Sequence, residues 1–198
     1  MLALPRGGVP VGYEVARVLE TPLDVFVVRK LGVPGHEELA MGAIASGGVR
    51  VLNPVVIRQL NISQPVIDAV AQGETRELQR RELRYRNHEM PIKLEHRIAL
   101  LVDDGLATGA TMRAAIAAVR QLGAGRIVVA VPVAAVDTAM SLESEVDELV
   151  CPLMPDEFHS VGHWYDRFDQ TTDEEVRELL ARASSAASAR DANAGSGA

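Results

Sequence analysis

Cysteine, aromatic residues and long apolar runs are scarce in this 198-residue sequence. Because Cys151 is the single cysteine, no intramolecular disulfide can form, and this agrees with the reducing cytoplasm. No apolar run approaches the roughly 20 residues that a membrane-spanning helix needs. The N-terminus also lacks the basic and then apolar pattern of a secretory signal peptide. We therefore expect a cytoplasmic protein that has no membrane partner.

Several common motifs of nucleotide-binding and hydrolytic proteins are also missing. The sequence contains no Walker A loop, since Ala110 stands where its lysine would be, and no nucleophile elbow around a serine. Gly123-Ala-Gly125 precedes an apolar run instead of following one, so it is not a dinucleotide-binding turn. Acidic residues outnumber basic ones by 27 to 20, and the net charge of −7 argues against a nucleic acid as partner.

Apolar, β-branched stretches alternate along the chain with stretches in which apolar residues recur at helical spacing. The predicted strands lie at residues 2–4, 24–29, 97–102, 126–133 and 148–151, with a hairpin over 39–52. The predicted helices lie at residues 9–19, 65–86, 110–122, 135–142 and 172–183. This alternation predicts an α/β fold with a doubly wound parallel sheet. We expect one domain over residues 1–183 and a disordered tail of small residues over 184–198.

The stretch over residues 98–112 carries the clearest functional signal. An apolar strand ends there in Asp103 and Asp104, and a small turn over 108–111 precedes a helix. Open parallel sheets bind ligands at the carboxyl ends of their strands, and a helix N-terminus favours anions. The turn offers amides and two hydroxyls to a phosphate, while the carboxylates suit sugar hydroxyls or a hydrated Mg²⁺. Together these groups predict a sugar-phosphate substrate.

Two other segments are candidates for binding an anion. After the first strand, Gly7 and Gly8 would let the backbone approach a ligand closely, and Arg6 is a bidentate donor. An ordinary strand-to-helix turn is the alternative interpretation of this loop. Lys30 ends the second predicted strand, and the predicted topology would bring it to the same sheet edge as Arg6. A solvated surface cation is the alternative for Lys30.

Residues 102–111, Val-Asp-Asp-Gly-Leu-Ala-Thr-Gly-Ala-Thr, resemble the phosphoribosyl-pyrophosphate (PRPP) signature of type I phosphoribosyltransferases. Residues 4–9, Leu-Pro-Arg-Gly-Gly-Val, resemble the pyrophosphate loop of that family, which often contains a non-proline cis peptide. The resemblance covers roughly residues 1–170. It implies a Mg²⁺-dependent glycosyltransferase of nucleotide metabolism that moves the phosphoribosyl group of PRPP to a nitrogenous base and releases pyrophosphate. It also implies a homodimer.

The resemblance assigns a role to each matching residue. Asp103 and Asp104 would act in catalysis by positioning the ribose hydroxyls and the metal shell. The 5-phosphate would be bound by the turn residues Thr108, Gly109, Ala110 and Thr111, and Ala107 beside them would also belong to the substrate-binding residues. The leaving pyrophosphate would be bound by Arg6, Gly7, Gly8 and Lys30.

The predicted helix over residues 65–86 occupies the place of the mobile catalytic flap in this family. A closing flap would bring cations over the pyrophosphate and exclude water from the reacting carbon. Arg81 and Arg84 are our candidates for these cations. The alternative is an exposed helix in which arginines and glutamates form ion pairs along one face.

Four of the seven aromatic residues follow the last predicted strand: Phe158, Trp164, Tyr165 and Phe168. We predict that they form a small C-terminal hood in which Trp164 and Tyr165 stack on the acceptor base. Packing into the core is the alternative.

The sequence departs from the family pattern at two places. Ala107 stands where 6-oxopurine enzymes carry an aspartate, so the turn resembles the adenine-type form and the acceptor stays open. The chain also begins one residue before its first predicted strand, where the family usually has a helix or hood segment. Either the start is truncated or the C-terminal aromatic residues serve alone. The alternative functions are a non-catalytic PRPP-sensing or nucleotide-sensing domain of the same fold, or a general sugar-phosphate-binding domain.

Overall fold

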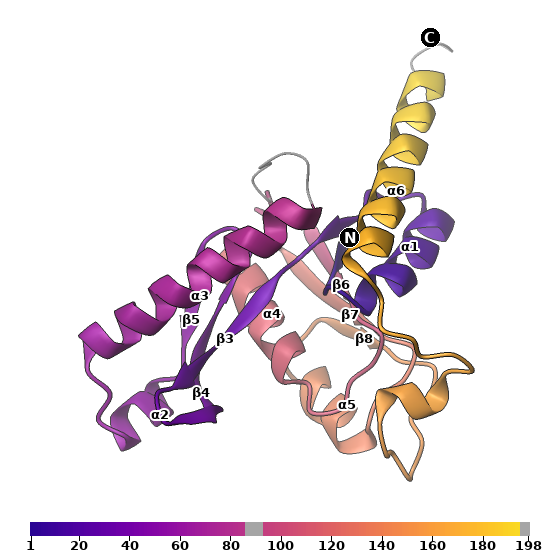
Figure 1. Ribbon diagram of the computed structural model, residues 1–198. Helices are drawn as coiled ribbons and strands as arrows, with labels where there is room; N and C mark the ends of the chain where they lie inside the picture. The colour runs from indigo at the N-terminus through magenta and orange to yellow at the C-terminus, as the bar shows by residue number, and fades with distance from the viewer. Residues whose placement is uncertain (86–92, 195–198) are drawn as a thin grey trace.

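The computed structural model describes residues 1–85 and 93–194, which form two β-sheets with helices packed around them (Figure 1). The larger sheet has five parallel strands in the order β2-β1-β6-β7-β8. These strands are β1 (Leu2–Ala3), β2 (Asp24–Val25), β6 (Ile98–Val102), β7 (Arg126–Ala130) and β8 (Glu148–Val150). The predicted parallel sheet is therefore confirmed, and β1 and β6, which precede the two candidate loops, are neighbours in it.

Helices cover both faces of the parallel sheet, because successive side chains of a strand point to opposite sides. Leu2 packs in one hydrophobic cluster with side chains of α4 (Ala110–Gln121). Ala3 belongs to a second cluster that includes Val9 of α1 (Gly8–Leu19). Two more helices complete these layers: α5 (Val136–Glu143) on the α4 side and α6 (Asp173–Ala194) on the α1 side. This is the predicted doubly wound arrangement.

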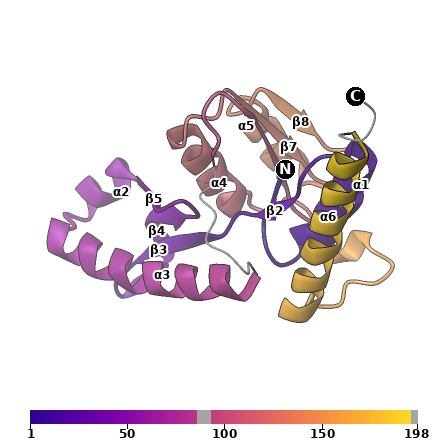
Figure 2. The same ribbon diagram turned by 90° about the horizontal axis from the view of Figure 1, so that it is seen from above.

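The smaller sheet is antiparallel, has the order β3-β4-β5, and is inserted between β2 and β6 along the chain. The inserted elements are β3 (Val28–Val33), β4 (His36–Ala45), β5 (Val49–Leu52), α2 (Pro54–Gln59) and α3 (Gln64–Tyr85). The predicted hairpin is confirmed as β4–β5, and its turn has φ of +84° at Gly47 and +75° at Gly48. Seen from above, the inserted part lies to one side of the parallel sheet (Figure 2).

The strand predicted over residues 24–29 is in fact two strands, since the chain leaves the parallel sheet at Phe26 and Val27. Ser46, which is fully buried, forms hydrogen bonds with the backbone groups at this break. Its hydroxyl accepts a hydrogen bond from the Val27 amide at 2.9 Å, and its own amide donates to the Val27 carbonyl at 2.8 Å. Because buried backbone groups need partners, this distant serine allows a break that the apolar run does not reveal.

Helix α3 has almost the bounds predicted for it, but it is not simply exposed. Ile67, Ala71, Leu78 and Tyr85 are buried in the cluster that also contains residues of β3 and β4. The charged residues occupy the remaining surface of the helix. The helix therefore belongs to the packed inserted part.

Helix α6 begins as predicted and ends later than predicted. Thr172 and Glu175 form a capping box: the Thr172 amide donates to Glu175 Oε2 at 2.7 Å, and the Glu175 amide donates to Thr172 Oγ1 at 3.2 Å. The helix continues to Ala194, so residues 184–194, expected to be disordered, are helical. This segment is rich in alanine, which has the highest helix propensity. Residues 195–198 lie outside the described residues. Within the described ranges, no helix has the length and apolar character needed to cross a membrane.

Candidate active site

The acidic pair, Asp103 and Asp104, follows β6 directly at the carboxyl end of the parallel sheet. The Asp104 amide donates a hydrogen bond to Asp103 Oδ1 at 2.9 Å. Burial, together with the nearby Asp104 carboxylate, raises the pKa of Asp103 to about 7, and burial also raises the pKa of Asp104. Near neutral pH the pair is therefore incompletely ionised, and a bound cation or hydroxyl donor would favour its charged form.

The glycine loop, residues 6–8, packs against the acidic pair. A Cβ atom at Gly7 would lie 1.9 Å from Asp104 Oδ2, and a Cβ atom at Gly8 would lie 2.6 Å from a main-chain carbonyl oxygen at the end of β6. Only glycine fits at either position without a shift of the neighbouring atoms. The Pro5–Arg6 peptide bond is cis, as the family resemblance implied.

The phosphate turn, residues 107–111, is held from two helices. Arg113 of α4 donates from Nη1 to the Thr108 carbonyl at 3.0 Å, and the Thr138 hydroxyl of α5 donates to the Ala107 carbonyl at 2.6 Å. Sequence reasoning missed both of these supporting residues. They lie outside the signature, and an arginine or a threonine on a helix is too common to indicate a role.

The remaining residues of the phosphate turn lead into α4. Gly109 has φ of +69°, a left-handed conformation that favours glycine. Ala110 and Thr111 open the helix, and both are exposed. Thr108 Oγ1 accepts a hydrogen bond from the Ala110 amide at 3.4 Å. A helix N-terminus with exposed residues of this size can receive an anionic group.

The aromatic segment after β8 reaches back to the acidic pair. The Tyr165 hydroxyl donates to the Asp104 carbonyl at 2.6 Å, and the ring centroids of Tyr165 and Phe168 are 5.2 Å apart. Burial and the charges of Asp104 and Asp103 raise the pKa of Tyr165 to about 12, so its hydroxyl remains a donor. Trp164 belongs to neither described hydrophobic cluster, and its buried Nε1 has no partner among the described residues. Its absence from both clusters speaks against packing of Trp164 into the core.

A cavity of about 590 Å³ lies between the glycine loop, Asp104 and the aromatic segment. Its lining includes Arg6, Gly7, Asp104, Tyr165 and Phe168. A cation, a carboxylate and an aromatic surface therefore face one space, at the edge where the sequence predicted a ligand. The structure brings together the predicted glycine loop, the acidic pair and part of the aromatic segment.

Of the two predicted flap arginines, only Arg84 shares a partner with Arg6, which lines this cavity. Arg84, at the end of α3, donates from Nη1 to Asp173 Oδ2 at 2.8 Å, and Arg6 lies 3.7 Å from Asp173 Oδ1. Arg81 instead donates to Glu77 of its own helix at 3.0 Å. Arg84 and Arg6 thus share one carboxylate, whereas Arg81 belongs to the ion pairs along α3 that the alternative interpretation described.

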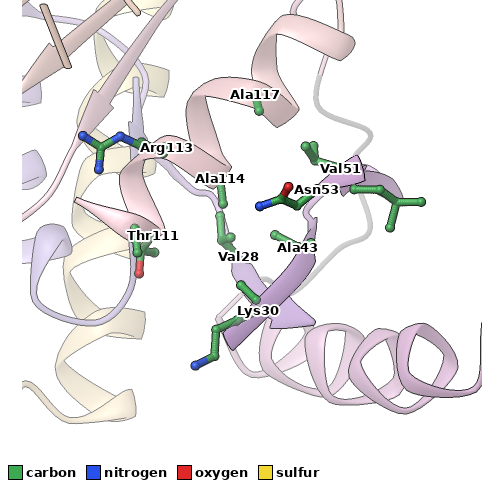
Figure 3. A pocket seen from close by; sticks show the side chains of 13 residues that line it. Val28, Lys30, Ala43, Val51, Asn53, Thr111, Arg113, Ala114 and Ala117 are labelled. Carbon is green, nitrogen blue, oxygen red and sulfur yellow. The ribbon is translucent and has the colours of Figure 1, made fainter. Parts of the chain in front are cut away.

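Lys30 lies on β3, beside the phosphate turn. Together with Ala110 and Thr111 it lines a cavity of about 290 Å³ between α4 and the antiparallel sheet (Figure 3). Its ammonium group is 3.9 Å from the exposed Glu38 carboxylate. We expected Lys30 at the same sheet edge as Arg6, but it lies on the antiparallel sheet next to the phosphate turn, and Arg6 lines the other cavity.

The carboxylates of the acidic pair are suited to a metal ion that is bound by the protein and by the substrate together. Over residues 1–85 and 93–194, no group of three or more His, Cys, Asp or Glu side chains could hold a metal ion by itself. Mg²⁺ usually binds through one or two carboxylates together with substrate phosphates and water. Asp103 and Asp104 therefore fit Mg²⁺ that is bound together with a phosphate ligand.

A doubly wound sheet whose neighbouring strands end in a glycine loop and in an acidic pair with a phosphate turn is the architecture of a phosphoribosyl transferase domain. The model of the family described as "Phosphoribosyl transferase domain" matches residues 1–166 of the chain. The chain belongs to this family.

Two named relatives agree with this assignment, and one solved structure is similar to this chain. "Putative phosphoribosyl transferase Rv0571c" and "Putative phosphoribosyl transferase MT0597", from the H37Rv and CDC 1551 strains of Mycobacterium tuberculosis, are each 50% identical over 183 residues. The match covers 92% of this chain and 41% of each relative, so the chain spans about two fifths of their length. The crystal structure of TT1426 from Thermus thermophilus is 42% identical, with a TM-score of 0.82 over 91% of this chain and 86% of that chain.

Proposed function

We propose that this protein transfers the phosphoribosyl group of PRPP to a nitrogenous base in the presence of Mg²⁺ and releases pyrophosphate. The observation that supports this proposal most directly is the contact between Gly7 and Asp104. It brings the loop suited to a leaving pyrophosphate against the carboxylates suited to a ribose. The ribose and the pyrophosphate, between which the bond breaks, would therefore both contact the protein.

The charges of the site match those that develop in this reaction. The bond between ribose C1 and the pyrophosphate oxygen breaks, and its electron pair leaves with the pyrophosphate. A lone pair on the base nitrogen forms the new bond to C1, and the proton of that nitrogen passes to solvent. Asp103 and Asp104 would stabilise positive charge on the ribose, and Arg6 would stabilise negative charge on the leaving group. Bound Mg²⁺ would neutralise part of the phosphate charge.

The 5-phosphate of PRPP fits the phosphate turn. The turn opens at the exposed N-terminus of α4, where backbone amides and the helix dipole favour an anion. Lys30 adds a positive charge in the adjoining cavity. This position supports a role for Lys30 at the 5-phosphate in place of the pyrophosphate contact expected from the sequence.

The acceptor base would lie under the aromatic segment. Tyr165 and Phe168 line the cavity that also contains Arg6 and Asp104, and aromatic rings stack on bases of any sequence. Ala107 is exposed and carries no carboxylate to handle a base proton. This supports an adenine-type acceptor over a 6-oxopurine.

The test is to incubate the protein with PRPP, Mg²⁺ and a panel of bases and to follow pyrophosphate release. We expect release with at least one base, and an Asp104→Asn variant that folds normally but is slower by roughly 100-fold or more, since a preorganised charge contact is lost. Asp68→Asn is the matched control, because Asp68 pairs with Arg50 on the inserted part, away from the cavity. Full activity of Asp104→Asn would contradict the role of the acidic pair. PRPP binding without release, with any base, would favour the sensing domain.

A further inference from the structure

Asp173, the first residue of α6, joins three side chains from two other parts of the chain. Its Oδ2 accepts a hydrogen bond from Arg84 at 2.8 Å, and its Oδ1 accepts one from the Tyr85 hydroxyl at 2.9 Å. The same Oδ1 lies 3.7 Å from Arg6 Nη1 of the glycine loop. One carboxylate therefore links the end of α3 to the loop proposed to hold pyrophosphate.

The three contacts of Asp173 are unequal. Arg84 and Tyr85 occupy its two oxygens at hydrogen-bonding distance, whereas Arg6 is beyond that distance. The Tyr85 hydrogen bond and the two guanidinium groups lower the pKa of Asp173, so it carries its charge at neutral pH. Two arginines share one carboxylate, so among the described residues of this group positive charges outnumber negative ones by one. Arg6 is the member held most weakly.

We infer that Asp173 is a positioning residue that competes with pyrophosphate for Arg6: it holds Arg6 beside Arg84 in the free protein and gives it up when pyrophosphate binds. This inference rests on the proposed function. Pyrophosphate carries several negative charges and replaces a single carboxylate at 3.7 Å, in an ion pair whose two side chains are each about one third exposed. Exposed ion pairs contribute little stability, so the exchange of partners at Arg6 needs little free energy. When pyrophosphate leaves, Asp173 again takes its place at Arg6 and opposes rebinding.

The test compares Mg²⁺–pyrophosphate binding by calorimetry in the wild-type protein and two variants. Asp173→Asn keeps the shape of the side chain and removes the charge that competes for Arg6. We expect it to bind pyrophosphate about two- to fivefold more tightly, as for the loss of an exposed ion pair. Glu174→Gln is the matched control, since Glu174 is the next residue of the same helical turn and pairs with Arg177. We expect its pyrophosphate affinity to equal that of the wild type.

A second variant tests the same inference, and it should change the affinity for pyrophosphate in the opposite direction. Tyr85→Phe removes the hydroxyl that holds Asp173 Oδ1 and leaves this oxygen free to approach Arg6. Pyrophosphate should then bind about twofold more weakly, although no charge has changed. Weaker or equal binding by a folded Asp173→Asn variant, or an equal gain in Glu174→Gln, would overturn the role of Asp173. Should Asp173→Asn not fold, unchanged or tighter binding by Tyr85→Phe would overturn it. A wild-type protein that does not bind pyrophosphate at all would instead overturn the proposed function, and this inference with it.

Discussion

The phosphate turn and the glycine loop both adjoin the acidic pair, but different forces hold them in place. Hydrogen bonds of 3.0 Å from Arg113 and 2.6 Å from Thr138 hold backbone carbonyls of the turn. Arg113 is itself anchored to Glu145 at 2.9 Å. The Arg6 side chain, in contrast, lies 3.7 Å from the carboxylate that it shares with Arg84. The turn is thus fixed through its backbone, whereas the cation of the glycine loop is held by a loose ion pair.

This difference matches what each side would do in the proposed reaction. The 5-phosphate stays attached to the ribose from substrate to product, so a fixed turn orients both without reorganisation. The pyrophosphate must be bound, stabilised as it gains charge, and released. A cation that exchanges one anion for another suits this second task. The backbone of the glycine loop is nevertheless fixed, because Gly7 and Gly8 pack directly against β6 and the acidic pair.

The largest effect should follow from breaking this fixed part of the glycine loop with Gly7→Ala. The new methyl group would lie 1.9 Å from Asp104 Oδ2, so the carboxylate must move. A displacement of about 1 Å in a catalytic group lowers the rate roughly 100-fold, and we expect a loss of that size in pyrophosphate release. Gly73→Ala in α3 is the control, because its methyl group meets no atom within 4 Å. It should keep full activity. A Gly7→Ala protein with wild-type activity would show that the close packing does not position Asp104.

The next largest effect should be a pH dependence of Mg²⁺ and PRPP affinity that comes from the acidic pair and not from the glycine loop or the phosphate turn. Because the pKa of Asp103 is about 7, its carboxylate fraction rises from about one tenth at pH 6 to about nine tenths at pH 8. If the ionised form binds Mg²⁺ and PRPP, affinity should rise about tenfold over this range. A titration of Mg²⁺ and PRPP at several pH values measures it, and Asp103→Asn should remove the rise.

The same group should make the folded protein less stable as the pH rises. Its ordinary pKa of 3.8 applies in the unfolded chain, so between about pH 4 and 7 only the folded state keeps the proton. The free energy of unfolding should therefore fall through this window by up to about 1.4 kcal/mol for each pH unit. Asp104 contributes in the same direction. Urea unfolding of the wild type and Asp103→Asn measures the difference, and equal slopes for the two would contradict the raised pKa.

Sequence reasoning correctly located the segments of the candidate site that are contiguous in the chain. Residues 103–111 carry the acidic pair and the turn within one strand–turn–helix unit, so their spacing alone predicts their common location. The same holds for Gly7 and Gly8 after β1. Lys30 shows where this reasoning fails: its position was predicted from an unbroken second strand, but the buried Ser46 redirects the chain into another sheet.

The supporting residues could not have been found in this way. Arg113, Thr138 and Asp173 come from three different helices and act through single contacts. Such contacts depend on how the helices pack, which leaves no periodic or spacing signal in the sequence. The predicted end of α6 was wrong for another reason. The small residues after it indicated disorder, although alanine also has the strongest tendency to form a helix.

The smallest effect is expected for a variant that weakens the support of the phosphate turn and leaves the glycine loop unchanged. Thr138→Val removes the hydroxyl that binds the Ala107 carbonyl but keeps a side chain of the same shape. The loss of one exposed hydrogen bond weakens an interaction by roughly 0.5–1 kcal/mol, so we expect the KM for PRPP to rise about two- to fivefold. The affinity for pyrophosphate alone should not change, because Arg6 and the glycine loop do not contact Thr138. Thr138→Ser keeps the hydroxyl and should retain the wild-type KM. If Thr138→Val weakened pyrophosphate as much as PRPP, the two sides would not be separate, and the contrast between a fixed turn and an exchangeable cation would have to be abandoned.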